Sequence, residues 1–164
     1  MTPRLLLLPL VALALAACHE EEDVDLDAPP AFCAQFSSVL TIVDQNSQQS
    51  SSFIQGEDIG FELVVTNDGT SRESLTVPDG CGQLRFEVYD DNSALLWTSH
   101  DDEVCTQATS FNTYEGGTSQ TFTATWDQVR RDGAAADIGD YTVTAVDRTE
   151  CASGLTKEGS FDIQ

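Results

Sequence analysis

The groups in this sequence that could do chemistry are five cysteines, two histidines and 28 acidic side chains. A zinc site would need cysteines or histidines at short paired spacings, but there is no CxxC pair, and His19 and His100 are far apart. Hydrolytic triads, HExxH zinc sites, phosphate-binding glycine loops and nucleophile elbows are also missing from the sequence. We therefore expect a noncatalytic protein with no cofactor and no metal.

Acidic residues gather at residues 90–92, 101–103 and 132–140, where carboxylate oxygens could ligate calcium or act as an acid–base pair. None of these segments has the twelve-residue pattern of an EF-hand, and neighbouring acids are common in a chain this acidic. His100 lies beside one of them. We expect all three segments, and His100, to be solvated loops.

A signal for export begins the sequence. Arg4 precedes an uncharged apolar stretch, residues 5–17, which is too short to cross a bilayer, and small residues lead up to Cys18. Residues 1–17 are therefore expected to be a signal peptide. Residues 15–18, Leu-Ala-Ala-Cys, resemble the lipobox of bacterial lipoproteins, which implies that Cys18 is lipidated and becomes the first mature residue. The alternative is an ordinary secretory signal that contains a cysteine.

Residues 18–31 are expected to form an acidic tether to the membrane. Six acids lie between His19 and Asp27, and Pro29 and Pro30 follow, so this segment repels itself and cannot close a core. His19 is not the aspartate that, in the lipoprotein sorting pattern, favours retention in an inner membrane. The resemblance thus implies a lipid-anchored protein of the cell envelope, at the outer membrane in a cell with two membranes.

The formal net charge of −21 limits the partners of the protein. Such a charge repels the phosphates of nucleic acids and anionic lipid headgroups, so we expect no nucleic-acid ligand and membrane contact through the lipid alone. The length of 164 residues favours one domain, which we place at residues 32–164. A protein partner is therefore the expected ligand class.

Four cysteines remain when Cys18 is lipidated: Cys33, Cys81, Cys105 and Cys151. An even number of cysteines in an exported domain favours disulfides, here two, and three connectivities are open.

The domain has the pattern of short strands separated by turns. Alternating β-branched or aromatic residues predict eight strands, at residues 39–43, 59–66, 74–77, 84–89, 94–97, 121–126, 141–146 and 160–163. The one helical candidate is residues 127–131. This spacing predicts an all-β fold, an immunoglobulin-like antiparallel β-sandwich of about seven to nine strands.

Three aromatic residues have expected places in such a sandwich. Trp97 and Trp126 lie in predicted strands, and we place both indoles in the core because they bury a large apolar area. Tyr141 follows Gly139 at the start of a late strand, which resembles a tyrosine corner whose hydroxyl bonds to upstream backbone.

Several short motifs follow one another in a distinctive order. They are QGEDI at residues 55–59, FELVVTN at 61–67, FEVYD at 86–90, LWTS at 96–99, FTATWD at 122–127 and GDYTV at 139–143. In this order they resemble the BsuPI-type intracellular proteinase inhibitor domain, over about residues 38–146. The resemblance implies an immunoglobulin-like fold and a protease as partner. Its motifs are scaffold strands, so it transfers no reactive-site residue.

The resemblance also implies a disulfide pairing. In the strand order that it implies, Cys81 and Cys105 flank one hairpin and are expected to join. Cys33 is then expected to pair with Cys151, which links the entry of the first strand to the loop before the last one.

The expected fold, anchor and family resemblance leave two classes of function open. One is a cell-envelope proteinase inhibitor that presents a loop from the sandwich, with residues 99–119 as the candidate loop. The other is a noncatalytic binding or scaffold lipoprotein, in which the same residues are a plain connection between strands.

Overall fold

The computed structural model describes residues 29–78, 80–101 and 104–164. The expected signal peptide, Cys18 and most of the expected tether lie outside these residues. The elements are η1 (Ala31–Gln35), β1 (Phe36–Val43), β2 (Ser52–Phe53), β3 (Ile59–Asn67), β4 (Glu73–Val77), β5 (Leu84–Asp90), β6 (Leu95–Thr98), β7 (Ser110–Tyr114), β8 (Ser119–Trp126), β9 (Gly139–Asp147), α1 (Ala152–Leu155) and β10 (Lys157–Ile163). No helix in the described part is long and apolar enough to cross a membrane.

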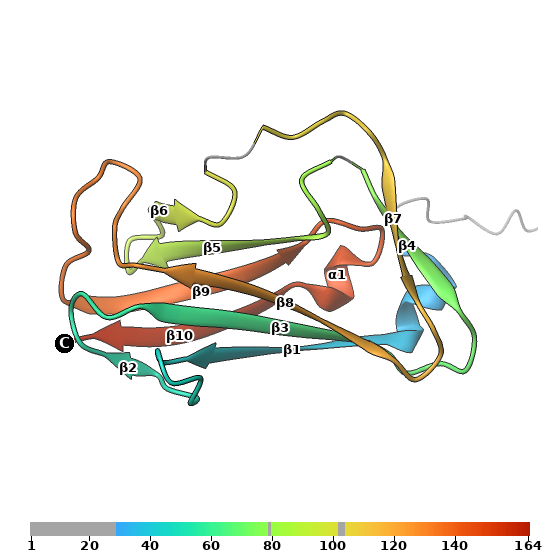
Figure 1. Ribbon diagram of the computed structural model, residues 1–164, viewed down its shortest axis with the longest axis horizontal. Coiled ribbons are helices and arrows are strands. Elements are labelled where there is room, and N and C mark those ends of the chain that lie inside the picture. Colours follow the sequence, from blue (N-terminus) through green and yellow to red (C-terminus); the bar gives the residue numbers. More distant parts are fainter. Residues whose placement is uncertain (1–28, 79, 102–103) are drawn as a thin grey trace, which may run out of the picture.

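The strands form two packed sheets and one small ribbon (Figure 1). One sheet has the order β1-β3-β8, the other β2-β10-β9-β5-β6, and β4 pairs with β7 at one end of the long axis. Neighbours are antiparallel except β2 and β10. The all-β immunoglobulin-like sandwich is confirmed, and each of the eight predicted strands is present.

Aromatic rings fill the space between the two sheets. Trp126 of β8 is fully buried, and its ring lies 5.8 Å from that of Tyr141 and 6.2 Å from that of Phe161. Trp97 is half-buried, with its ring 6.0 Å from Phe61 and 6.5 Å from Trp126. Edge and stacked contacts at these distances stabilise a core beyond the area that they bury. Trp126 thus occupies the core as expected, whereas Trp97 packs against its border.

The tyrosine corner is present. The hydroxyl of Tyr141 donates to the carbonyl of Asp137, four residues upstream, and the ring stacks on Phe161 at 5.7 Å. This contact fixes the turn by which the chain enters β9.

The prediction of a helix at residues 127–131 is wrong. The carboxylate of Asp127 accepts the N–H of Val129 at 3.0 Å, and Gln128 has a φ of 60°. Val129 then forms an antiparallel bridge with Ala135, so the segment is a hairpin. An aspartate that bonds to backbone two residues on favours such a turn over a helix.

Gln128 joins this hairpin to the turn between β2 and β3. Its side chain is buried, and its Oε1 accepts the N–H of Gly56 at 2.7 Å. Its Nε2 donates to the carbonyls of Ile54 and Glu57 at 2.9 and 2.8 Å. One amide therefore satisfies three backbone groups of a turn that has no ladder of its own.

Gln128→Glu should destabilise the domain by about 3 kcal/mol, because a buried carboxylate cannot donate to the two carbonyls that face it. Urea unfolding measures this change in the free energy of unfolding. Gln45→Glu, at an exposed position, is the matched control and should change stability by less than about 0.5 kcal/mol. Equal effects at the two positions would contradict the role assigned to Gln128.

Candidate functional site

Residues 104–111 form the most exposed stretch between β6 and β8, and we call them the exposed segment. Each of these residues is exposed, with 97% of Val104 and 66% of Phe111 accessible to solvent. None of them is charged, although the chain as a whole is strongly acidic. They lie within residues 99–119, the loop expected from the sequence.

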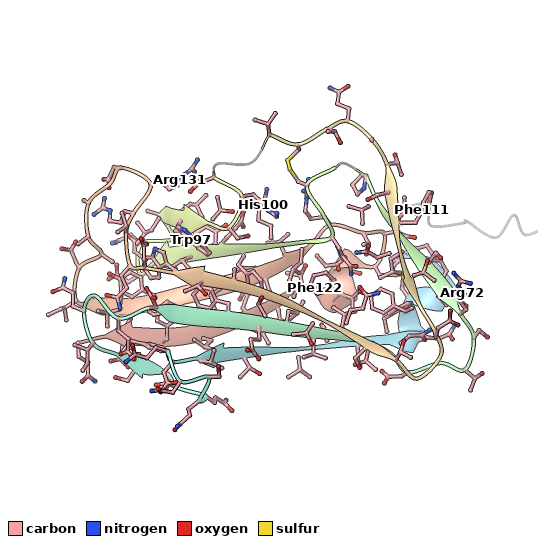
Figure 2. The ribbon with its side chains drawn as sticks, in the orientation of Figure 1. Arg72, Trp97, His100, Phe111, Phe122 and Arg131 are labelled. Atoms are coloured by element: carbon pink, nitrogen blue, oxygen red, sulfur yellow. A yellow bond between two sulfur atoms is a disulfide. The ribbon has the colours of Figure 1, made fainter. Side chains whose placement is uncertain are left out.

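A disulfide holds the start of the exposed segment. Cys105 is joined to Cys81, whose side chain is buried, and the sulfur–sulfur bond is visible in Figure 2. Next to it, the N–H of Gly80 donates to the carbonyl of Thr106 at 2.8 Å. A Cβ at Gly80 would overlap the hydroxyl of Thr106, so a larger residue there would require the Thr106 side chain to move. The second bridge joins Cys33 to Cys151, and both pairs are those that the resemblance implied.

A strand holds the end of the exposed segment. Its last two residues, Ser110 and Phe111, begin β7, which pairs with β4. The expected loop is therefore shorter than residues 99–119, because β7 lies within it. Sequence analysis missed β7, whose five residues do not alternate between apolar and polar. Phe111 lies on β7, far along the long axis from Trp97 and Arg131 (Figure 2).

A buried polar network fixes β7 to the sandwich. Gln83 is 1% exposed, and its Oε1 accepts hydrogen bonds from Nδ2 of Asn112 at 2.8 Å and from the hydroxyl of Tyr114 at 2.9 Å. Its Nε2 donates to Asp147 at 2.7 Å. Two side chains of β7 thus bond to one buried amide. Nothing in the sequence singled out Gln83, which lies in a polar turn after Cys81.

The same network reaches the second disulfide. Asp147 is 2% exposed, and its other carboxylate oxygen accepts the backbone N–H and the hydroxyl of Thr149. That hydroxyl oxygen in turn accepts the N–H of Cys151 at 3.2 Å. Glu150 also accepts the N–H of Thr76 in β4 at 2.8 Å. The buried network therefore joins β7 to the Cys33–Cys151 disulfide, and a separate bond from the same loop holds β4.

Asn67 secures the turns at the far end of β7. It is fully buried, its Nδ2 donates to the carbonyl of Ser71 at 2.8 Å and its Oδ1 accepts the N–H of Gly69 at 3.0 Å. The backbone of Asn67 also bonds to Gly117 and Thr118, which lie between β7 and β8. One asparagine thereby joins the β3–β4 turn to the β7–β8 turn.

A cleft lies elsewhere among the described residues, between β6 and the hairpin after β8. It has a volume of about 640 Å³ and is lined by Trp97, Thr98, Ser99, Asp101, Asp127, Val129, Arg130 and Arg131. Its two arginines are paired with carboxylates, Arg131 with Asp101 at 2.9 Å and Arg130 with Asp132 at 3.0 Å. The charges of both arginines in the cleft are thus balanced by neighbouring carboxylates.

The acidic segments have structural uses. Asp90 Oδ1 accepts the N–H groups of Asn92 and Ala94 at 3.0 and 2.8 Å and so closes the β5–β6 turn. Among the described residues, no group of three or more His, Cys, Asp or Glu side chains is placed to hold a metal ion. His100 is half-buried at the end of the β6 turn.

A family match covers the exposed segment and most of the sandwich. Residues 46–151, more than half of the chain, match the family described as BsuPI, intracellular proteinase inhibitor. The chain belongs to the BsuPI family. No curated protein matches it. The match covers the exposed segment, the Gln83 network and every motif that carried the resemblance.

The structure explains the first BsuPI motif, residues 55–59. Gly56 has a φ of 87°, a conformation that favours glycine, and its N–H bonds to Gln128. The side chain of Gln55 donates to the carbonyl of Ala136 at 2.8 Å, and Glu57 accepts the N–H of Ile54 at 3.2 Å. These contacts hold the turn between β2 and β3 to the hairpin after β8.

Solved structures match the chain at low identity. A β-glucosidase from Listeria innocua in complex with glucose is 12% identical, with a TM-score of 0.44 over 78% of this chain and 16% of its own. A β-glucosidase from Erythrobacter marinus is 13% identical, with a TM-score of 0.44 over 79% and 16%. The alkylpurine DNA glycosylase AlkC from Pseudomonas fluorescens, bound to DNA, is 8% identical, with a TM-score of 0.47 over 79% and 30%. The chain spans about a sixth of the length of the two glucosidases.

Tyr114 gives the network a measurable pH dependence. Burial raises the pKa of its phenol well above the ordinary value of 10.0. Above about pH 10 the unfolded chain loses this proton while the folded domain keeps it, so the free energy of unfolding falls as the pH rises toward the folded pKa. Below pH 10 the phenol is neutral in both states and contributes no slope.

Tyr114→Phe should remove this slope. Wild-type stability should fall more steeply than that of the variant above about pH 10, by up to about 1.4 kcal/mol per pH unit. At neutral pH the variant should be less stable by about 1 kcal/mol, because the hydrogen bond to Gln83 is lost.

Urea unfolding from neutral pH to above pH 10 measures both effects. The raised pKa values of Tyr89 and Tyr141 act equally in both proteins. Parallel curves above pH 10 would contradict the assignment.

Proposed function

We propose that this BsuPI protein is a noncatalytic, lipid-anchored proteinase inhibitor of the cell envelope, and that the exposed segment enters the cleft of the protease. The membership in a family of proteinase inhibitors supports the inhibitory activity. The observation that carries the choice of segment is its restraint at both ends, by Cys81–Cys105 and by the β4–β7 ribbon.

Restraint is what an inhibitory loop needs. A segment that is already ordered loses little conformational entropy when a protease binds it, so more of the contact energy appears as affinity. The disulfide and the Gly80–Thr106 hydrogen bond order one side of the exposed segment, and the Gln83 network orders the other. The residues between them have no regular hydrogen-bonded structure, which leaves their backbone groups available to an enzyme.

The charge of the exposed segment fits the same role. It contains no acidic residue, so an acidic protease that approaches this segment meets less electrostatic repulsion than elsewhere on the acidic domain. It contains no lysine or arginine either. A target protease would therefore accept uncharged side chains such as those of Val104, Thr106 and Ala108.

The anchor follows from the sequence. Cys18 would carry the lipid, and the thirteen residues from Cys18 to Pro30 reach at most about 45 Å when fully extended. The described chain begins beside η1, at the same end of the long axis as the β4–β7 ribbon (Figure 1). We expect this tether to hold the domain within that distance of the membrane.

Inhibition is tested by titrating the domain, residues 28–164, against serine, cysteine and metalloproteases. We expect stoichiometric loss of activity of at least one protease while the domain stays intact. Val104→Asp should weaken this inhibition about tenfold or more, because it places a charge in the contact. Val39→Asp is the matched control, since Val39 is 63% exposed on β1, and should inhibit like the wild type.

Equal inhibition by the Val104 variant would place the contact outside the exposed segment. No inhibition of any protease would exclude the inhibitor function and favour a tethered binding module.

The anchor is tested by Cys18→Ser in the full chain. The wild type should incorporate labelled fatty acid and sediment with membranes, because two or more acyl chains give stable anchoring. The variant should lose the label and the membrane fraction. Ser37→Ala, at an exposed position of β1, is the control and should keep both. Fatty-acid labelling that persists in Cys18→Ser would contradict lipidation at this residue.

A further inference from the structure

The outer edge of β8 is an unprotected strand edge. β8 lies at the border of its sheet, and its eight residues, Ser119–Trp126, pair with β3 on one side only. It contains no charged residue, no proline and no glycine. Its register with β3 runs without a bulge. Long, flat, uncharged edges of this kind are ready to pair with another strand, and natural proteins usually block them.

The register shows which backbone groups face outward. Successive residues at the end of β3 bond to opposite neighbours. Asn67 N–H donates to Thr118 O at 3.0 Å on the β8 side, and Asp68 N–H donates to Gln35 O at 2.7 Å on the β1 side. Because antiparallel pairs alternate, every second residue of β8 bonds to β3, beginning with Gln120. The residues between them have backbone groups that point away from the sheet, and these are Ser119, Thr121, Thr123 and Thr125.

A side-chain contact agrees with this assignment. The hydroxyls of Thr66 and Ser119 lie 2.8 Å apart, as expected for a pair that does not exchange backbone hydrogen bonds and whose side chains are closer. Within the described part of the chain, the contacts of β8 beyond its ladder are made by side chains. Gln120 donates to Thr113 O, and Trp126 donates to Val129 O.

In the described part of the chain, the edges of β6 and β1 each accept or donate hydrogen bonds to a neighbouring segment. On β6, Arg131 N–H donates to Leu96 O at 2.8 Å, and Asp101 accepts Thr98 N–H at 3.3 Å. Arg131 and Asp101 are joined to each other, so they cover that edge together. On β1, Ser50 N–H donates to Ile42 O at 3.0 Å. The edge of β8 has no such cover among the described residues.

We propose that β8 binds β8 of a second copy of this chain across a two-fold axis, which joins the two sheets into one with the order β1-β3-β8-β8-β3-β1. A strand pairs antiparallel with itself in such an interface, and the same residues serve on both sides. Threonine lies opposite threonine, a favourable cross-strand pair. Two copies of an acidic protein can approach closely only where charge is absent, and β8 meets this condition.

Three registers centred on the middle of β8 bring outward-facing residues opposite each other. They place Thr123 opposite Thr121, Thr123 or Thr125 of the other copy. In all three, the two residues at position 123 lie within about 8 Å of each other. A cysteine at this position therefore reports pairing in each of these registers.

The test is cross-linking of full-length Thr123→Cys with a short thiol-specific cross-linker in membranes of cells that produce it. We expect a product with twice the mass of the chain. Ser160→Cys is the matched control, since Ser160 is exposed on β10 in the other sheet, opposite Thr142 of β9. It should give at least tenfold less dimer.

A second set of variants shows that the strand edge makes the contact. Adding Thr121→Lys and Thr125→Lys to Thr123→Cys should reduce the dimer at least tenfold, because edge lysines repel a second copy. Adding Thr121→Val and Thr125→Val should keep it. Thermal melting of each variant checks that the fold is retained. Four outcomes would each overturn the proposal. They are equal amounts of dimer with cysteine at positions 123 and 160, no dimer with cysteine at position 123, a cross-linked product of any other mass, and a dimer that persists with both lysines.

Discussion

The buried carboxylate of Asp147 is the constraint on which one end of the structure depends. A carboxylate away from water needs donors, and Asp147 has three, from Gln83 and from the N–H and hydroxyl of Thr149. Because Asp147 only accepts, it fixes the orientation of the Gln83 amide, with Nε2 toward the carboxylate. Oε1 is then left for donors, and Asn112 and Tyr114 of β7 supply them. The position of β7 is thus set by a charge on β9.

This dependence explains why the exposed segment can be ordered without a core of its own. A two-stranded ribbon such as β4–β7 is marginal when isolated in water. Here it is bound to the sandwich by the Gln83 network, by Asn67 and by the edge contact of the Tyr114 and Phe36 rings at 5.3 Å. The Cys81–Cys105 bridge then needs to restrain only the start of the segment. The two restraints act on opposite sides of the residues that contact solvent.

The fold could be predicted from the sequence because alternation of apolar and polar residues reports the two faces of a strand directly. β3 shows this: its side chains alternate between buried and half-buried positions along its whole length. β7 could not be predicted, since its stability comes from Gln83 and Asp147, which are distant in sequence. The helix at residues 127–131 failed for a related reason. Gln128 adopts a φ of 60° because its amide bonds to three backbone groups of the turn around Gly56, and no local pattern encodes that contact.

The distribution of charge connects the exposed segment with the edge of β8. Residues 104–126 include both and contain one charged residue, Glu115, whose carboxylate is paired with Arg72 at 3.4 Å. At a net charge of −21, long-range repulsion acts against most encounters with acidic proteins, including further copies of this chain. Salt screens this repulsion beyond about 10 Å at moderate ionic strength. The repulsion therefore slows the approach of acidic proteins from every side, and short-range contacts decide whether they bind. A neutral band on an acidic surface therefore selects where contact occurs. In this domain, the fold places the exposed segment and the outer edge of β8 within that band.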